Sequence, residues 1–118
     1  MKTELYKRNV KEKIVFAMLD YMSEDDECGY SKKDVKKCER VLLKYLNKLG
    51  KLSRSTEDFI MEQVKKVVLD LNKLNDKTDC TLIETDVREE IWQIIQDSAV
   101  ECGVDPSVED VTEEWREW

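Results

Sequence analysis

The chain has 118 residues, enough for one domain with one hydrophobic core. It is rich in charged residues (40%), poor in glycine (3) and proline (1), and contains no histidine. The lack of histidine excludes Ser-His and Cys-His nucleophile pairs and the Glu-x-x-His motif of helical di-iron bundles. Scarce glycine and proline are typical of long helices joined by short connections.

No segment is apolar over the length of a membrane span, and no basic-then-apolar leader opens the chain, so we expect a cytoplasmic protein. The acidic segment 23–31, "SEDDECGYS", lacks the ligand order of a calcium loop. The cysteines form no C-x-x-C pair, which favours reduced thiols over a zinc site. We therefore expect no metal and no cofactor. The four cysteines are Cys28, Cys38, Cys80 and Cys102.

A first helix is predicted from about Thr3 to Met22. Its second half is apolar nearly all round, which predicts that neighbouring helices wrap it or that a second copy of the chain covers it. The expected inward stripe is Tyr6, Val10, Ile14, Ala17, Met18 and Tyr21, and the expected other side is Val15, Phe16, Leu19 and Met22. A homodimer would use Phe16, Leu19 and Met22 of that other side.

Two further helices should form an antiparallel hairpin, because the connection between them is short. Ser31 opens the first of them, with Asp34 at the capping-box position, and Gly50 is placed to end it in a left-handed conformation. Ser55 is expected to start the second, with Asp58 three residues later. The expected buried positions are Val35, Cys38, Val41, Leu42, Tyr45, Leu46 and Leu49, then Ile60, Met61, Val64, Val67, Val68, Leu71 and Leu74.

A loop at 75–81 precedes a fourth helix from about Thr85 to Cys102, with Gly103 as its stop. Its expected inward residues are Val87, Ile91, Ile94, Ile95 and Cys102, with Trp92 and Ala99 on the flank. Beyond Pro106, both Ser107 and Thr112 could cap a last short helix. The sequence therefore predicts an all-α fold, a four-helix bundle-like single domain over residues 1–118 with a short C-terminal helix.

Charge is distributed unevenly along the chain. Residues 1–29 carry 5 basic and 7 acidic groups, residues 30–83 carry 13 and 8, and residues 84–118 carry 2 and 12. Two stripes of opposite sign recur at helical spacing. The basic stripe is Lys33, Lys37, Arg40, Lys44 and Lys48, and the acidic stripe is Asp86, Glu90, Asp97 and Glu101.

Each stripe could simply be a solvated outer face, the two could complement each other within a monomer or across a dimer, or each could meet an outside partner. Nucleic acid is the less favoured partner, because no aromatic platform accompanies the basic stripe and the net charge is −7. A basic protein would suit the acidic stripe and the tail. Regular spacing on a polar face argues against paired carboxylates that act as catalysts.

The chain closes on "TEEWREW", in which Trp115 and Trp118 lie three residues apart and hence on one face of a helical turn capped by Thr112. Arg116 could pair with the acidic face of the fourth helix or stack on an indole. The two indoles either seal the bundle near Trp92 or form an exposed hot spot for a partner.

The last third, "LIETDVREEIWQIIQDSAVECGVDPSVEDVTEEWREW", resembles a family of small, acidic, uncharacterised bacterial proteins. The shared features are Leu-Ile-Glu-Thr, a helix containing Arg-Glu-Glu, a glycine after that helix and the closing Glu-Trp-Arg-Glu-Trp. The resemblance implies a compact helical fold in a bacterial cytoplasm and no known activity. By analogy of size and charge alone, such proteins include immunity proteins that block a toxin.

We expect a non-enzymatic protein-interaction protein of immunity or regulatory type. The alternatives are a homodimeric structural protein and an enzyme, which would need a convergent polar cluster in a deep apolar pocket. The predicted partner-binding residues are Asp86, Glu90, Asp97, Glu101, Trp115 and Trp118.

Overall fold

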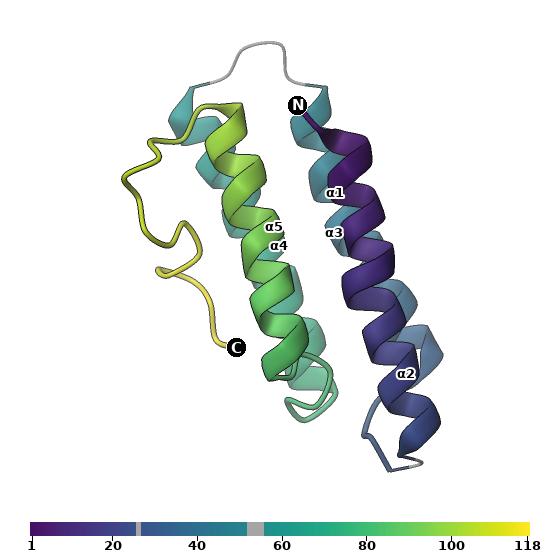
Figure 1. The fold of residues 1–118 in the computed structure, drawn as a ribbon. Coiled ribbons are helices and arrows are strands. Elements are labelled where there is room, and N and C mark those ends of the chain that lie inside the picture. The colour runs from purple at the N-terminus through teal and green to yellow at the C-terminus, as the bar shows by residue number, and fades with distance from the viewer. Residues whose placement is uncertain (26, 52–55) are drawn as a thin grey trace.

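A computed structural model describes residues 1–25, 27–51 and 56–118 of the chain. It is an all-α bundle (Figure 1), as the sequence predicts, and no strand occurs in these ranges. Three segments join end to end into the first rod, and one helix forms each of the other three rods. The elements are α1 (Thr3–Asn9), the π-helix η1 (Val10–Val15), α2 (Phe16–Glu24), α3 (Lys32–Gly50), α4 (Glu57–Lys77) and α5 (Thr85–Cys102).

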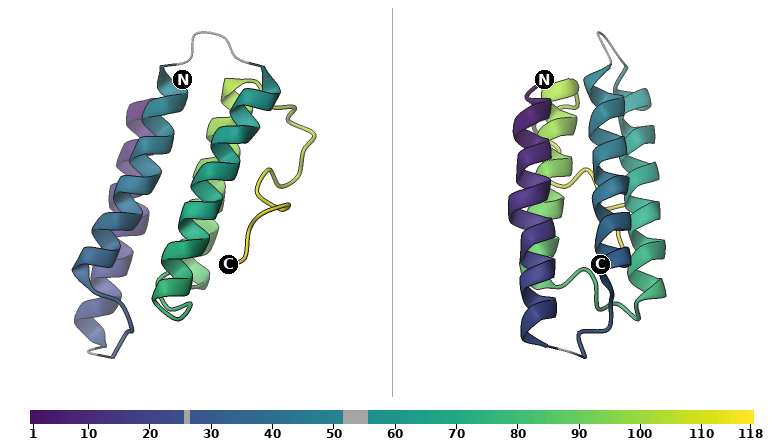
Figure 2. Two further views of the ribbon diagram at one scale, coloured as in Figure 1. Left: turned by 180° about the vertical axis from the view of Figure 1, so that it is seen from behind. Right: turned by 90° about the vertical axis from the view of Figure 1, so that its right-hand side faces the viewer.

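Consecutive rods run antiparallel, so the bundle is up-down-up-down (Figures 1 and 2). The first rod packs against α3 and α5, and α4 packs against the same two helices. After α5 the chain turns back and runs along the outer side of the α4–α5 pair, away from the first rod. None of the helices described is both long and apolar enough to cross a membrane.

Local signals set most of the helix ends. The capping box is confirmed: the Asp34 amide donates to Ser31 Oγ (3.4 Å), and the Ser31 amide donates to Asp34 Oδ2 (2.9 Å). Gly103 ends α5 with φ +133°, and the Val104 amide donates to the Ala99 carbonyl, as in a Schellman motif.

Two predicted boundaries differ in the structure, and a third lies outside the described residues. The expected start at Ser55 lies outside the described residues, and Thr56 caps α4 by accepting from the Phe59 amide (3.3 Å). Gly50 does not end α3 with a positive φ; a Cβ at this position would lie 2.9 Å from Thr3 Oγ1, so the glycine permits close approach of the N-terminus. Helix α4 continues past Asn75, whose buried side-chain oxygen accepts from the Ile83 amide (3.0 Å).

The first rod contains a π-helical turn that the hydrophobic pattern did not predict. In η1 the hydrogen bonds run from residue i to i+5, so Val10 and Val15 lie one turn apart and are both buried. The extra residue rotates the following apolar stripe. The expected inward positions of Ala17 and Tyr21 are therefore wrong: both are exposed, and Val15 is buried in the core instead.

Because of the same rotation, the residues expected to form a dimer interface do not lie on one exposed face. Leu19 and Met22 are half-buried against the core of their own chain, whereas Phe16 is 50% exposed. The three side chains therefore do not form one outward apolar surface, and the structure gives no support to a homodimer through them.

Candidate functional site

The predicted acidic stripe lies along α5 as expected, but its two ends have different surroundings. At the C-terminal end, Glu101 accepts from the Tyr6 hydroxyl (2.5 Å) and the Lys2 amide (3.0 Å). The Tyr6 hydrogen bond is the main reason that the pKa of Glu101 is lowered. Asp97 accepts from Gln93 (2.8 Å). The carboxylates at this end of the stripe therefore accept hydrogen bonds from other residues of the same chain.

The N-terminal end of the stripe is free of such contacts. Asp86 is exposed and Glu90 is half-buried, and neither side chain has a hydrogen bond or ion pair to a described residue. Glu84, which precedes α5, is also exposed. None of these three carboxylates is therefore paired with a described cation, and we call them the free acidic end.

A pocket of about 270 Å³ adjoins the free acidic end, between α2 and the start of α5. Two tyrosine rings, Tyr21 and Tyr30, stack 6.4 Å apart at 17° and line it. We call this cavity the tyrosine pocket. Its other lining residues are the apolar Ala17, Met18, Leu82 and Val87 and the carboxylates Asp20, Glu24, Glu84 and Asp86.

The tyrosines of this pocket are held by local structure. The Tyr30 hydroxyl donates to the Met18 carbonyl (3.0 Å), which ties the ring to α2. Burial is the main reason that the pKa of Tyr30 is raised to about 12, and Cys28, Tyr21 and Glu84 raise it further in that order. The carboxyl of Asp25 raises the pKa of Tyr21, which is exposed. A carboxyl therefore acts mainly on Tyr21, and burial acts mainly on Tyr30.

The predicted partner-binding tryptophans lie against the bundle. Trp115 and Trp118 are half-buried and pack on the hydrophobic core. The side chain of Asn72 on α4 donates to the Trp115 carbonyl (2.7 Å) and accepts from the Glu117 amide (3.1 Å). The indoles thus serve largely to attach the tail.

A second amide side chain fixes the tail nearer its start. Gln96 of α5 donates to the Val108 carbonyl (2.8 Å) and accepts from the Val111 amide (2.9 Å). Gln96 is buried, as is Asn72. Each amide therefore binds the backbone of the tail through two hydrogen bonds, and neither was recognised from sequence.

Asp110 organises the tail in place of the expected caps. Its Oδ1 accepts from Trp92 Nε1 (2.9 Å) and from the amide (2.9 Å) and hydroxyl (2.5 Å) of Thr112, and its Oδ2 lies 3.0 Å from Arg116. Burial acts against ionisation, but these donors outweigh it and lower the pKa of Asp110. Asp105 accepts in the same way from the Ser107 amide (2.9 Å). Ser107 and Thr112 are thus turn residues bound by an aspartate two positions earlier.

The short C-terminal helix is reduced to a single turn. The Arg116 amide donates to the Thr112 carbonyl (2.9 Å), and no regular helix follows α5 in the described residues. Arg116 also lies over the Trp118 ring, 5.4 Å from its centroid, so it stacks on an indole and pairs within the tail rather than with α5. The Trp118 indole N–H is buried without a partner in the described residues.

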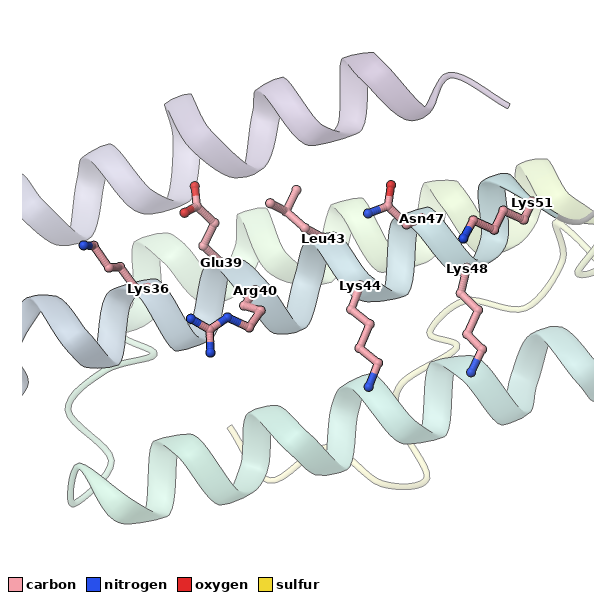
Figure 3. Close-up of a pocket in the computed structure, with 8 residues that line it drawn as sticks. All are labelled: Lys36, Glu39, Arg40, Leu43, Lys44, Asn47, Lys48 and Lys51. Carbon is pink, nitrogen blue, oxygen red and sulfur yellow. The ribbon is translucent and has the colours of Figure 1, made fainter.

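The basic stripe forms an outer face of the molecule on α3. An open groove of about 770 Å³ runs along it, and Figure 3 shows Lys44 and Lys48 directed toward α4 and Glu39 directed toward the first rod. Glu39 pairs with Lys11 (3.3 Å). Contact with Lys77 of α4 lowers the pKa of Lys37, because two like charges lie together. The basic and acidic stripes therefore do not neutralise each other within the monomer.

The potential metal ligands of the described residues lie apart. Within the described ranges, no three His, Cys, Asp or Glu side chains gather closely enough to hold a metal ion, and all four cysteines are free thiols. Cys38 is buried, and burial raises its pKa to about 12.

Comparison of the chain with protein-family models, with curated proteins and with solved structures found no match. The family resemblance of the last third therefore stays a prediction.

Proposed function

We propose that this protein is a non-enzymatic binding protein of the bacterial cytoplasm, of the immunity or regulatory type, whose acidic face docks a basic partner protein. One observation carries the proposal: Glu84, Asp86 and Glu90 lie at or near the N-terminal end of α5, and none of them makes an ion pair with a described residue. Unneutralised charge of one sign on a rigid helix attracts and orients a partner of the opposite sign.

Under this proposal the predicted residues contribute unequally to binding. Trp115 and Trp118 attach the tail, and Glu101 is bound to Tyr6 and to the backbone of Lys2. The contribution to binding therefore falls mainly on Asp86 and Glu90, with Asp97 at the margin. Binding of a partner would therefore depend more on electrostatic attraction than on the burial of apolar surface.

The proposal is tested by affinity capture from the cells that produce the protein, at about 50 mM and about 500 mM salt. The Debye length falls from more than 10 Å to less than half of that across this range, so charge-driven binding should weaken steeply. The double variant Asp86→Asn/Glu90→Gln should lose the captured protein, and the matched variant Lys44→Gln/Lys48→Gln on α3 should retain it.

Equal capture by both variants, or capture that does not respond to salt, would contradict the proposal. A captured protein without a basic surface would do so as well.

A further inference from the structure

We propose that the tyrosine pocket receives an arginine side chain. This inference rests on the proposed function, because the arginine would belong to the basic partner that docks on the acidic face. The pocket combines the two features that a guanidinium needs: aromatic ring faces to stack on and carboxylates for its N–H groups.

The rings of Tyr21 and Tyr30 form an aromatic wall of the tyrosine pocket. Tyr21 and Tyr30 present nearly parallel rings, and the Tyr30 hydroxyl is tied to the Met18 carbonyl, so this ring is held in place before binding. Because Tyr21 is 43% exposed, part of its ring is open to an incoming group. A guanidinium stacks on such a face through its planar, weakly hydrated surface.

The rim supplies the charge. Asp20 and Glu24 come from α2, and Glu84 and Asp86 come from the start of α5, so carboxylates border the cavity from two elements. None of the four side chains makes an ion pair with a described residue, and no Lys or Arg lines the cavity. An arginine could therefore form paired N–H···O bonds without displacing a cation of this chain.

The size and the floor fit one long side chain. Pockets for drug-sized ligands measure about 300–1,000 Å³, and this one has about 270 Å³. Its floor of Met18, Leu82 and Val87 is apolar, which suits the aliphatic stem of an arginine. The charged group would remain between the rings and the rim.

The test uses four small probes and follows the ring resonances of Tyr21 and Tyr30 by NMR. The probes are N-acetyl-arginine amide, N-acetyl-lysine amide, the neutral citrulline analogue and spermidine. We expect saturable shifts of both rings with the arginine probe, in the millimolar range. The lysine probe should bind more weakly, and the citrulline analogue, which keeps the shape without the charge, should give no saturable shift.

Variants connect the shifts to the pocket. Tyr21→Leu should weaken the arginine probe about two- to five-fold, the range of an exposed cation–π contact. Tyr21→Phe should retain binding, because it keeps the ring. Glu84→Gln/Asp86→Asn should weaken binding at least as much, and the matched tail variant Glu113→Gln/Glu114→Gln should leave it unchanged.

Several results would overturn the inference. They are equal shifts with the citrulline analogue, tighter binding of lysine or spermidine than of the arginine probe, and equal loss in the tail variant. Failure of the proposed function is separable from these results. If the arginine probe binds but no basic partner exists, the site stands and the function fails; if a partner binds equally well to Tyr21→Leu, the function stands and the site fails.

Discussion

Replacing Asp110 with alanine should release the tail from the bundle. The substitution removes the acceptor of three hydrogen bonds, from Trp92 and twice from Thr112, and the ion pair to Arg116. Hydrogen bonds to a charged group each contribute about 1.5–3 kcal/mol, and the contributions within one network are not additive. We therefore expect the free energy of unfolding to fall by about 2–4 kcal/mol.

Urea denaturation followed by tryptophan fluorescence measures this loss, because Trp92 and Trp115 report on the docked tail. The control is Glu109→Gln, an exposed neighbour without a hydrogen bond or ion pair to any described residue, which should change stability by less than about 0.5 kcal/mol. A loss in Asp110→Ala no larger than that of the control would mean that the tail does not depend on this carboxylate.

The pH dependence gives the same reasoning a second check. The pKa of Asp110 is lowered in the fold, so its stabilisation is present above its ordinary pKa of 3.8 and is lost as the pH falls through the folded value. The stability difference between the wild type and Asp110→Asn should therefore be constant near neutral pH and shrink in acid. A difference that does not change with pH would refute the electrostatic explanation.

Three further predictions concern the core and the helix ends. Asn72→Asp places a carboxylate against the Trp115 carbonyl, so the free energy of unfolding should fall by about 2–3 kcal/mol at pH 7. Stability should recover in acid, because protonation of the carboxylate restores a donor, and urea titrations at both pH values measure the difference. The pKa of Cys38 is raised from 9.0 to about 12, so its thiolate forms more readily in the unfolded chain and stability should fall between these pH values. The contribution of Cys38 is up to about 1.4 kcal/mol per pH unit, and Cys38→Ala should reduce the slope by that amount in denaturation measured at pH 8–11. Gly103→Ala should lower stability by about 1–3 kcal/mol in thermal unfolding, because φ is +133° there; an unchanged Tm would contradict the Schellman assignment.

The hydrophobic pattern and the local capping signals predicted the bundle well. The predicted inward residues of the three later helices are all buried or half-buried, because regular α-helical spacing holds in these helices. The assumption of regular spacing failed in the first rod. A π turn leaves no distinctive residue pattern, and one extra residue moved Tyr21 out of the core and onto the wall of the tyrosine pocket.

The candidate site was only partly predictable for a related reason. The position of Asp86 on the outer face of α5 follows from helical periodicity alone. The pairing of Tyr21 with Tyr30 depends on how the loop after α2 folds back, which no local rule specifies. Polar residues next to buried apolar ones, such as Asn72 beside Leu71 and Gln96 beside Ile95, were a usable signal for the amides that bind the tail. Asp110, two residues before Thr112, was a usable signal for the turn that it stabilises.

The way the tail is held separates stability from binding. The two amides hold its backbone, at Val108 and Val111 and at Trp115 and Glu117, so the exposed side chains of the tail contribute little to the docked path. Its exposed carboxylates, together with those at the free acidic end of α5, can therefore be neutralised at little cost to the fold. A loss of partner binding in such variants would report the interface itself, because the bundle and the docked tail would remain as they are in the wild type.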